Sequence, residues 1–211
     1  MANIDGHEYI EIGGVKWATM NIGANSVTDY GQYFQWGDTT GYLSGQCGSS
    51  GTTYAKPFTW TDYTFSGGRS TPGTTGMTKY NASDGKTVLD ICNDAARLNW
   101  GGSWRMPTKD EYVALGEAVN TAWTANYQGS GVSGLVCTDK TDSSKVLFFP
   151  ACGSCNDGSV RAVGSWGDYW SSSVDSSYFR YGHLFIFNNV SADWLRQGDR
   201  CGGHSVRGVV G

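Results

Sequence analysis

Charged side chains are scarce in this sequence. Asp, Glu, Lys and Arg make up 16% of the 211 residues, against about 25% in typical globular domains. The net charge is -4, so the chain lacks the basic surface that binding to a phosphate backbone requires, and no nucleic-acid partner is expected. It also lacks an apolar run of about 18 residues, and membrane insertion is therefore not expected.

Residues with catalytic chemistry are few as well. The four Glu and three His form no recognisable Ser-His-Asp or paired-carboxylate pattern. Of the six Cys only Cys152 and Cys155 lie close in sequence, and a zinc site would need two further ligands at suitable spacing. Small buried thiols or a disulfide explain this pair better. The sequence thus predicts a protein that is not an enzyme and needs no cofactor.

Calcium is the second metal for which the sequence offers candidate ligands. Asp90, Asn93 and Asp94 place side-chain oxygens within one turn, but their spacing is not that of an EF-hand. Asp and Asn at such positions serve equally well as helix caps. Both interpretations stay open at this point.

Glycine and aromatic residues, in contrast, are abundant. The chain has 31 Gly and 14% aromatic residues, whose rings must be buried or used, so a folded protein is expected. Short apolar and aromatic runs bounded by turn residues predict strands within 8–37 and then at Gly134–Thr138, Val146–Pro150, Asp168–Ser173, Leu184–Asn188 and Ser205–Val210. With few helices, this pattern predicts an α+β fold with antiparallel sheets.

The clearest helix is predicted to follow Pro107. Thr108 and Glu111 form a capping box, in which each side chain satisfies a free backbone amide. A shorter helical turn is predicted within Leu89–Leu98. After the capping box, apolar residues recur at near-helical spacing, at Tyr112, Leu115, Val119 and Trp123.

Residues 38–87 are rich in Gly, Ser, Thr, Tyr and Asp and show no sustained period. We interpret them as an ordered insertion rather than as a domain. Aromatic residues are expected to hold this insertion against the rest of the protein: Tyr54, Phe58, Trp60, Tyr63 and Phe65.

Several segments together resemble one family. They are Val15–Ala24, Tyr33–Asp38, Asp94–Thr108, and Tyr169–Ser173 with Ser205–Arg207. In these segments and their order the chain resembles the Fibrobacter succinogenes major paralogous domain family. That family is a branch of the formylglycine-generating-enzyme-like group, which has the C-type lectin fold. The resemblance runs from about residue 8 to the end.

The resemblance implies a single C-type lectin-like domain over residues 1–211, with antiparallel sheets, one or two helices and long ordered loops. Such domains are numerous in gut Bacteroidetes and their phages. A position on the surface of a phage virion or a bacterial cell is therefore expected. The first residues, Met1 to Asp5, have neither the basic nor the apolar part of a secretory signal.

The fold also leads to expectations for individual residues. Tyr9–Ile12 should pair with Val206–Val210. Arg105 and Arg207 should each take part in a structural ion pair rather than contact a ligand. Large rings are expected in the core, at Trp17, Trp36, Trp100, Trp104 and Trp170.

The segment 174–204 departs most from the family pattern. Within it, Gly182–Asn188 reads as a strand with apolar residues on both faces, which indicates either a fully buried strand or an exposed apolar patch. The motifs on either side of the segment, Tyr169–Ser173 and Ser205–Arg207, match the family, whereas the residues between them do not. This arrangement resembles the variable proteins of diversity-generating retroelements. Their adenine-directed mutagenesis cannot yield Lys, Glu, Gln, Met or Trp, and the segment holds only Trp194 and Gln197 of these types.

The sequence therefore predicts a non-catalytic protein whose diversified C-terminal segment binds a protein or glycan ligand on a cell surface. The alternatives are a fixed-specificity adhesin or carbohydrate-binding module of the same fold and, with no recognisable active-site segment, a formylglycine-generating-type oxidase. The candidate ligand-binding residues are expected to be exposed in one patch: Tyr178, Phe179, Arg180, Tyr181, His183, Leu184, Ile186, Trp194, Leu195 and Asp199.

Overall fold

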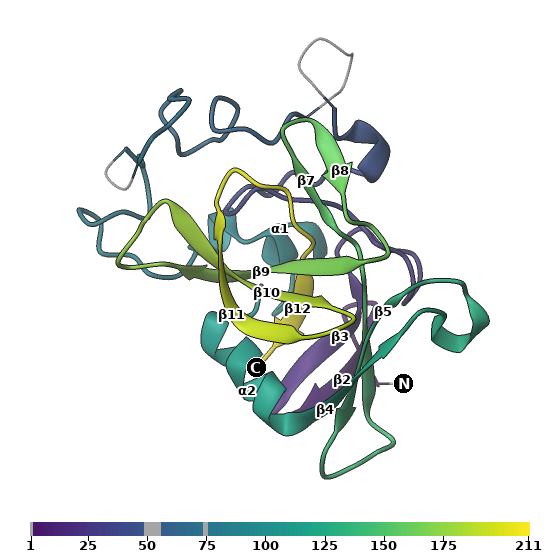
Figure 1. The fold of residues 1–211 in the computed structure, drawn as a ribbon. Helices are drawn as coiled ribbons and strands as arrows, with labels where there is room; N and C mark the ends of the chain where they lie inside the picture. The colour runs from purple at the N-terminus through teal and green to yellow at the C-terminus, as the bar shows by residue number, and fades with distance from the viewer. Residues whose placement is uncertain (1, 49–55, 74–75) are drawn as a thin grey trace.

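The first and last strands of the chain share one antiparallel sheet in this computed structural model, which describes residues 2–48, 56–73 and 76–211. The order in this sheet is β1-β2-β3-β12 (Figure 1). Its strands are β1 (Ala2–Ile4), β2 (His7–Ile12), β3 (Val15–Asn21) and β12 (Arg207–Val210). The first and last strands form the two opposite edges of this sheet, with β2 and β3 between them.

The direct pairing expected between Tyr9–Ile12 and the C-terminal strand is wrong. The strand β3 lies between them, and its Trp17 faces Ile10 of β2 on one side and Val209 of β12 on the other. The reason is local: a two-glycine turn that begins at Gly13, with positive φ at both glycines, closes β2 and β3 into a hairpin.

Two further sheets and a short hairpin complete the strands of the described residues. Their orders are β11-β10-β9 and β4-β5-β6, with β7 paired to β8, and every pairing is antiparallel. The bounds are β4 (Val119–Thr124), β5 (Gly134–Asp139), β6 (Val146–Pro150), β7 (Ser154–Asn156), β8 (Ser159–Arg161), β9 (Trp166–Val174), β10 (Tyr181–Asn188) and β11 (Ala192–Asp199). The α+β class is confirmed, and the predicted strands correspond to β5, β6, β9, β10 and β12.

Helical segments are short in the described part of the chain. They are the 3-10 turns η1 (Ser44–Gln46), η2 (Ile91–Asn93) and η3 (Tyr127–Gly129) and the helices α1 (Ala95–Trp100) and α2 (Lys109–Ala118). Among the described residues, no helix has both the length and the apolar character that crossing a membrane requires. The helical turn predicted within Leu89–Leu98 is present as η2 followed by α1.

The helix α2 begins at the predicted capping box. Thr108 accepts a hydrogen bond from the amide of Glu111 at 3.2 Å, and the Glu111 carboxylate accepts one from the amide of Thr108 at 2.7 Å. Its predicted continuation through Val119 to Trp123 is wrong, because the helix ends at Ala118. Val119–Thr124 forms β4 instead, since pairing with β5 satisfies its backbone and suits its β-branched and aromatic side chains.

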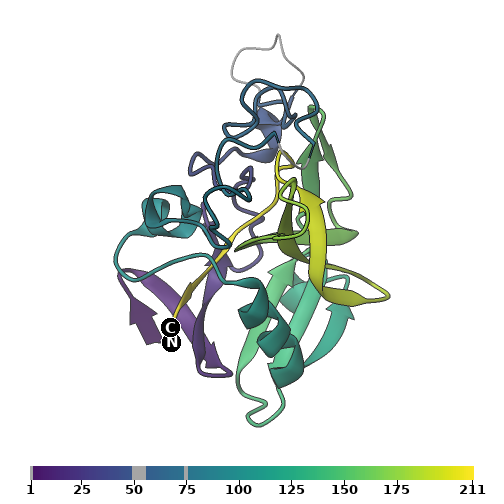
Figure 2. The same cartoon turned by 90° about the vertical axis from the view of Figure 1, so that its left-hand side faces the viewer.

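The helix α2 lies between the N-terminal sheet and the sheets formed later in the chain (Figure 2). The ring of Tyr112 connects them: its centroid is 5.4 Å from that of Trp17 on β3 and 5.4 Å from that of Phe185 on β10. Burial of these three rings joins the two ends of the sequence into one core.

The insertion 38–87 arches over one end of the molecule, toward β7 and β8 (Figure 1). Four of its aromatic side chains, Phe58, Trp60, Tyr63 and Phe65, are buried, which confirms that they hold it to the body. Tyr54 lies outside the described residues. The segment from Tyr30 to Gly37 was expected to be a strand, but it forms only isolated bridges, at Tyr33 and Phe34.

Buried tryptophans form the centre of the protein, as predicted. Trp17, Trp36, Trp104 and Trp170 are each at most 1% exposed, and Trp100 packs against the core from its edge. The predicted ion pair of Arg105 is confirmed, with Glu111 at 2.5 Å. The one expected of Arg207 is wrong.

Arg207 is fully buried and donates to neutral oxygens instead of a carboxylate. Asn21 Oδ1 accepts at 2.8 and 2.9 Å, and carbonyls of Ala18, Thr19 and Phe148 accept at 3.0 to 3.2 Å. Its guanidinium also lies 4.5 Å from the ring centroid of Phe149. Several neutral acceptors and a ring face thus stabilise this charge together.

Replacing Trp170 by Ala should lower the free energy of unfolding by about 3–5 kcal/mol, because a fully buried indole is lost. Its N–H also donates to the carbonyl of Phe34 at 2.8 Å. Thermal unfolding should show a melting temperature at least roughly 6 °C lower. The control Val190→Ala, at a side chain that is 86% exposed, should change stability by about 0.5 kcal/mol or less. A similar small change for both variants would contradict the core position of Trp170.

Candidate ligand-binding surface

The sheet β11-β10-β9 carries most of the candidate residues, and one of its faces packs on α2. On that face Trp194 stacks on Phe185, with ring centroids 4.0 Å apart and planes 1° apart. The helix allows this contact at Gly116, where a Cβ atom would lie 2.6 Å from the indole nitrogen of Trp194. The expectation that Trp194 belongs to an exposed patch is therefore wrong, because its ring is partly buried against α2 and β10.

The prediction of exposure also fails for His183 and Leu184, which are 9% and 3% exposed. Both lie on β10, the middle strand of the sheet, where each face is covered. Leu184 packs on the aromatic core, close to Trp170 and over Gly198. Of the two alternatives for this strand, a buried strand or an apolar patch, the structure has the buried strand.

Phe179 and Ile186 are half-buried and pack against the same core, so they contribute little free surface. Arg180 and Asp199 pair with each other through two hydrogen bonds of 2.6 and 2.7 Å. The guanidinium of Arg180 also lies 5.4 Å from the ring centroid of Trp60, which belongs to the insertion. These residues form the support of the surface rather than its exposed part.

The exposed part comes from the loop between β9 and β10 and from the outward side of β11. Tyr178 and Leu195 are 55% and 46% exposed. Tyr181, the first residue of β10, is half-buried rather than exposed as predicted, and its ring lies 6.5 Å from that of Tyr178 at the border of this surface. A shallow hollow of about 440 Å³ separates Tyr181 from the side chains of β11. We call this surface the display face: Tyr178, Tyr181, Asp193, Leu195, Arg196 and Gln197.

Three of these residues, Asp193, Arg196 and Gln197, were not predicted from the sequence. The signal was the alternation on either side of Trp194, which would have placed Asp193 and Leu195 on the outer face of a strand. The strand β11 is at the edge of its sheet, and the side chain of Asp193 accepts a hydrogen bond from the amide of Leu195 at 3.1 Å. Gln197 donates to the carboxylate of Asp175.

Behind the display face lies Arg200, which is fully buried. It donates to the hydroxyl of Tyr63 at 2.8 Å and to the carbonyls of Lys79, Tyr80 and Phe179 at 2.8 to 3.1 Å. Its guanidinium lies between aromatic rings; the ring centroids of Trp36, Tyr63, Phe65 and Tyr80 are 4.6 to 5.9 Å away. Arg200 thus connects the insertion, the β9–β10 loop and the end of β11 at one point.

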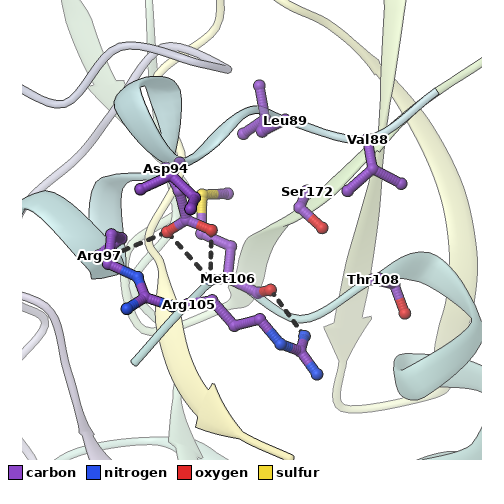
Figure 3. Close-up of a pocket in the computed structure, with 9 residues that line it drawn as sticks. Val88, Leu89, Asp94, Arg97, Arg105, Met106, Thr108 and Ser172 are labelled. Carbon is purple, nitrogen blue, oxygen red and sulfur yellow. Dashed lines mark hydrogen bonds between the residues drawn. The ribbon is translucent and has the colours of Figure 1, made fainter. Parts of the chain in front are cut away.

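A separate hollow of about 240 Å³ lies where α1, α2 and β9 meet (Figure 3). Its carboxylate, Asp94, already accepts hydrogen bonds from the amides of Arg97 at 3.0 Å and Met106 at 2.9 Å. Arg105 on its wall is paired with Glu111, and Ser172 donates to the carbonyl of Pro107. These polar groups hold the segments around the hollow together and are not free for a ligand.

The candidate calcium ligands do not fit a calcium ion. The carboxylate of Asp90 pairs with Lys79 at 3.0 Å and with Lys86 at 2.7 Å. Lys79 also donates to Asn93, and Asp94 caps α1 through the amide of Arg97. The ammonium groups of Lys79 and Lys86 thus occupy the positions beside Asp90 at which a calcium ion would have to bind. In the described residues, no group of three or more His, Cys, Asp and Glu is arranged around a metal position.

The cysteine side chains are free thiols in this structure. Cys152 and Cys155 are fully buried and Cys201 is nearly so. Burial raises the pKa of the thiols of Cys152 and Cys201, so both stay protonated at neutral pH.

No family model, curated protein or solved structure matches this chain.

Asp168 and His204 form a buried pair beneath β9, with Asp168 Oδ2 and His204 Nδ1 3.6 Å apart. Burial raises the pKa of Asp168 to about 7 and lowers the pKa of His204 to about 3. In the unfolded chain the order of the two pKa values is reversed, with Asp168 at 3.8 and His204 at 6.5. Between about pH 4 and 6.5 the pair therefore binds one proton in either state, and its net effect on stability does not change with pH.

Removing one partner should expose the opposing effects. In Asp168→Asn, His204 remains, and its lowered pKa makes stability fall as the pH drops from 6.5 toward 4. In His204→Gln, Asp168 remains, and its raised pKa makes stability fall as the pH rises from 4 to 7. Each slope should approach the one-proton limit of about 1.4 kcal/mol per pH unit, relative to the parent, in denaturant unfolding series. Parallel pH profiles for all three proteins would contradict this assignment.

Proposed function

We propose that this chain is a non-catalytic ligand-binding protein in which a C-type lectin-like scaffold presents the display face to a protein or glycan on a cell surface. The observation that carries the proposal is the contrast within residues 174–204. Tyr178, Leu195 and Arg196 have exposed side chains, whereas the residues behind them are held in place by Arg200 and by the stack of Trp194 on Phe185. The binding specificity of a protein can change without loss of its fold when the supporting residues are fixed and the exposed side chains can vary.

The composition of the display face supports a recognition role. Two tyrosines, an arginine and a leucine supply residue types that are frequent in binding hot spots or that add apolar area. Asp193 and Arg196 add both signs of charge, with only a long contact of 3.9 Å between them. Such a mixture favours a specific surface of another macromolecule over a small substrate.

Diversification by a retroelement is part of the proposal. Five of the six display residues are types that adenine-directed mutagenesis of Asn codons yields. Of the two types in the segment that it does not yield, Trp194 is held against α2, and Gln197 is bonded to Asp175. The variable positions would then be Tyr178, Tyr181, Asp193, Leu195 and Arg196.

A fixed-specificity adhesin of the same fold is the second candidate, and the exposed Gln197 favours it. A formylglycine-generating-type oxidase has less support, because a reactive cysteine works as a thiolate and burial keeps the thiols of Cys152 and Cys201 protonated.

The DNA that follows the coding sequence separates the first two candidates. Diversification predicts a near-copy of the segment for residues 174–204, with adenines at the codons of the variable positions, and a reverse-transcriptase gene nearby. If sequencing of the locus shows neither, the diversified function is wrong and the fixed-specificity module takes its place.

Exchange of display residues should leave folding intact. The triple variant Tyr178→Ser, Leu195→Ser, Arg196→Ser should melt within a few degrees of the parent, because exposed positions change stability by about 0.5 kcal/mol or less each. The matched control Leu184→Ser should lose about 2–5 kcal/mol, since its side chain is 3% exposed.

The binding role itself is testable with a library randomised at the five variable positions and displayed on yeast. Selection against a purified model protein should enrich specific binders, while a library randomised at His183, Leu184, Phe185 and Phe187 should fail to fold. Loss of folded protein from the first library would overturn the display function.

A further inference from the structure

A neutral groove lies at the opposite end of the same sheet from the display face. It consists of two adjoining hollows, of about 350 and 190 Å³, which share Trp123, Asn188 and Asn189 in their walls. The groove is bounded by β4, by the start of β9 and by the turn between β10 and β11, which reaches toward β5 in Figure 1. Asn188 is seven residues from Tyr181 along β10, about 23 Å at the usual rise of a strand.

The groove walls carry no formal charge. Among all the residues that line the two hollows there is no Asp, Glu, Lys or Arg; the polar members are Asn, Ser and Thr. An anionic or cationic ligand would find no counter-charge here, so the walls favour a neutral ligand that offers many hydrogen-bonding groups.

Two indole rings supply the apolar part of the groove. Trp166, the first residue of β9, is 41% exposed, in contrast to the buried tryptophans of the core. Trp123 is half-buried, and the ring of Phe187 at 6.4 Å supports it from behind. In the described ranges no acceptor bonds either indole N–H, whereas those of Trp36 and Trp170 each donate to a carbonyl.

Amide and hydroxyl groups are available beside the rings. The carbonyl oxygen of Asn188 accepts from the amides of Val190 at 2.8 Å and Ser191 at 3.0 Å. This fixes its side chain and leaves its two N–H donors unused within the described residues. Asn189 and Ser165 are exposed and line the same hollow.

This combination matches the chemistry of a sugar ring. A pyranose has one face of C–H groups, which carry a small positive charge and pack on the negative face of an indole. Its edge carries neighbouring hydroxyls, which pair with the donors and acceptors of amides and hydroxyls. We propose that the groove between Trp123 and Trp166 binds a neutral oligosaccharide. This site is independent of the display face and of its diversification.

Isothermal titration with neutral hexasaccharides tests the proposal. Maltohexaose, cellohexaose, mannohexaose and xylohexaose serve as probes, and hexagalacturonic acid serves as the charged comparison. At least one neutral probe should bind in the micromolar to low millimolar range, and the charged one should bind more weakly. The absence of binding by all four neutral probes would overturn the proposal.

Variants then locate the site. Trp166→Ala should weaken binding about tenfold or more while the melting temperature stays near that of the parent, because the indole is exposed. Trp123→Phe, which keeps a ring in the half-buried position, should weaken it less. Leu98→Ala, at a side chain of α1 that is 53% exposed and lines neither hollow of the groove, should leave the affinity unchanged. Unchanged affinity in Trp166→Ala, or loss of affinity in Leu98→Ala, would show that the sugar binds elsewhere and the groove assignment is wrong.

Discussion

The buried guanidinium of Arg200 is the interaction on which the binding end of this protein depends. A buried charge is costly unless hydrogen bonds and favourable contacts surround it, and here three carbonyls, one hydroxyl and four ring faces do so. These groups come from the insertion, the β9–β10 loop and the core, so Arg200 is satisfied only when all three are in place. Arg207 has the same role between the N-terminal sheet and β6.

This arrangement explains how a sheet with few helices supports a surface of free side chains. The middle strand β10 is mostly buried on both faces, whereas the edge strand β11 packs Trp194 against α2 at Gly116 and leaves Leu195, Arg196 and Gln197 exposed. These three consecutive residues do not alternate, because the register between β10 and β11 shifts between Leu184 and Ile186. The chemistry of the display residues can then differ while the backbone beneath them stays the same.

The parts of this structure that local patterns determine were predictable from the sequence. The capping box at Thr108 and Glu111 and the buried tryptophans are such parts, because neighbouring residues or size alone decide them. The end of α2 was missed, since Val119 and Trp123 continue a helical spacing and only pairing with β5 makes them a strand. The burial of Leu184 was ambiguous because apolar residues on both faces of a strand fit two environments. The partners of Arg207 could not be predicted from the sequence, because they are neutral oxygens of residues distant in the chain and not an acidic side chain that a charge pattern would indicate.

The hydrogen bond from the amide of Leu195 to the side chain of Asp193 has a consequence for self-association. An edge strand offers a row of free amides and carbonyls on which a strand from another molecule can grow a continuous sheet. Here the amide of Leu195 on the edge strand is already occupied by the side chain of Asp193, whose carboxylate adds charge at the same place. A protein whose edge is blocked in this way can be crowded on a surface in many copies with less tendency to polymerise through it.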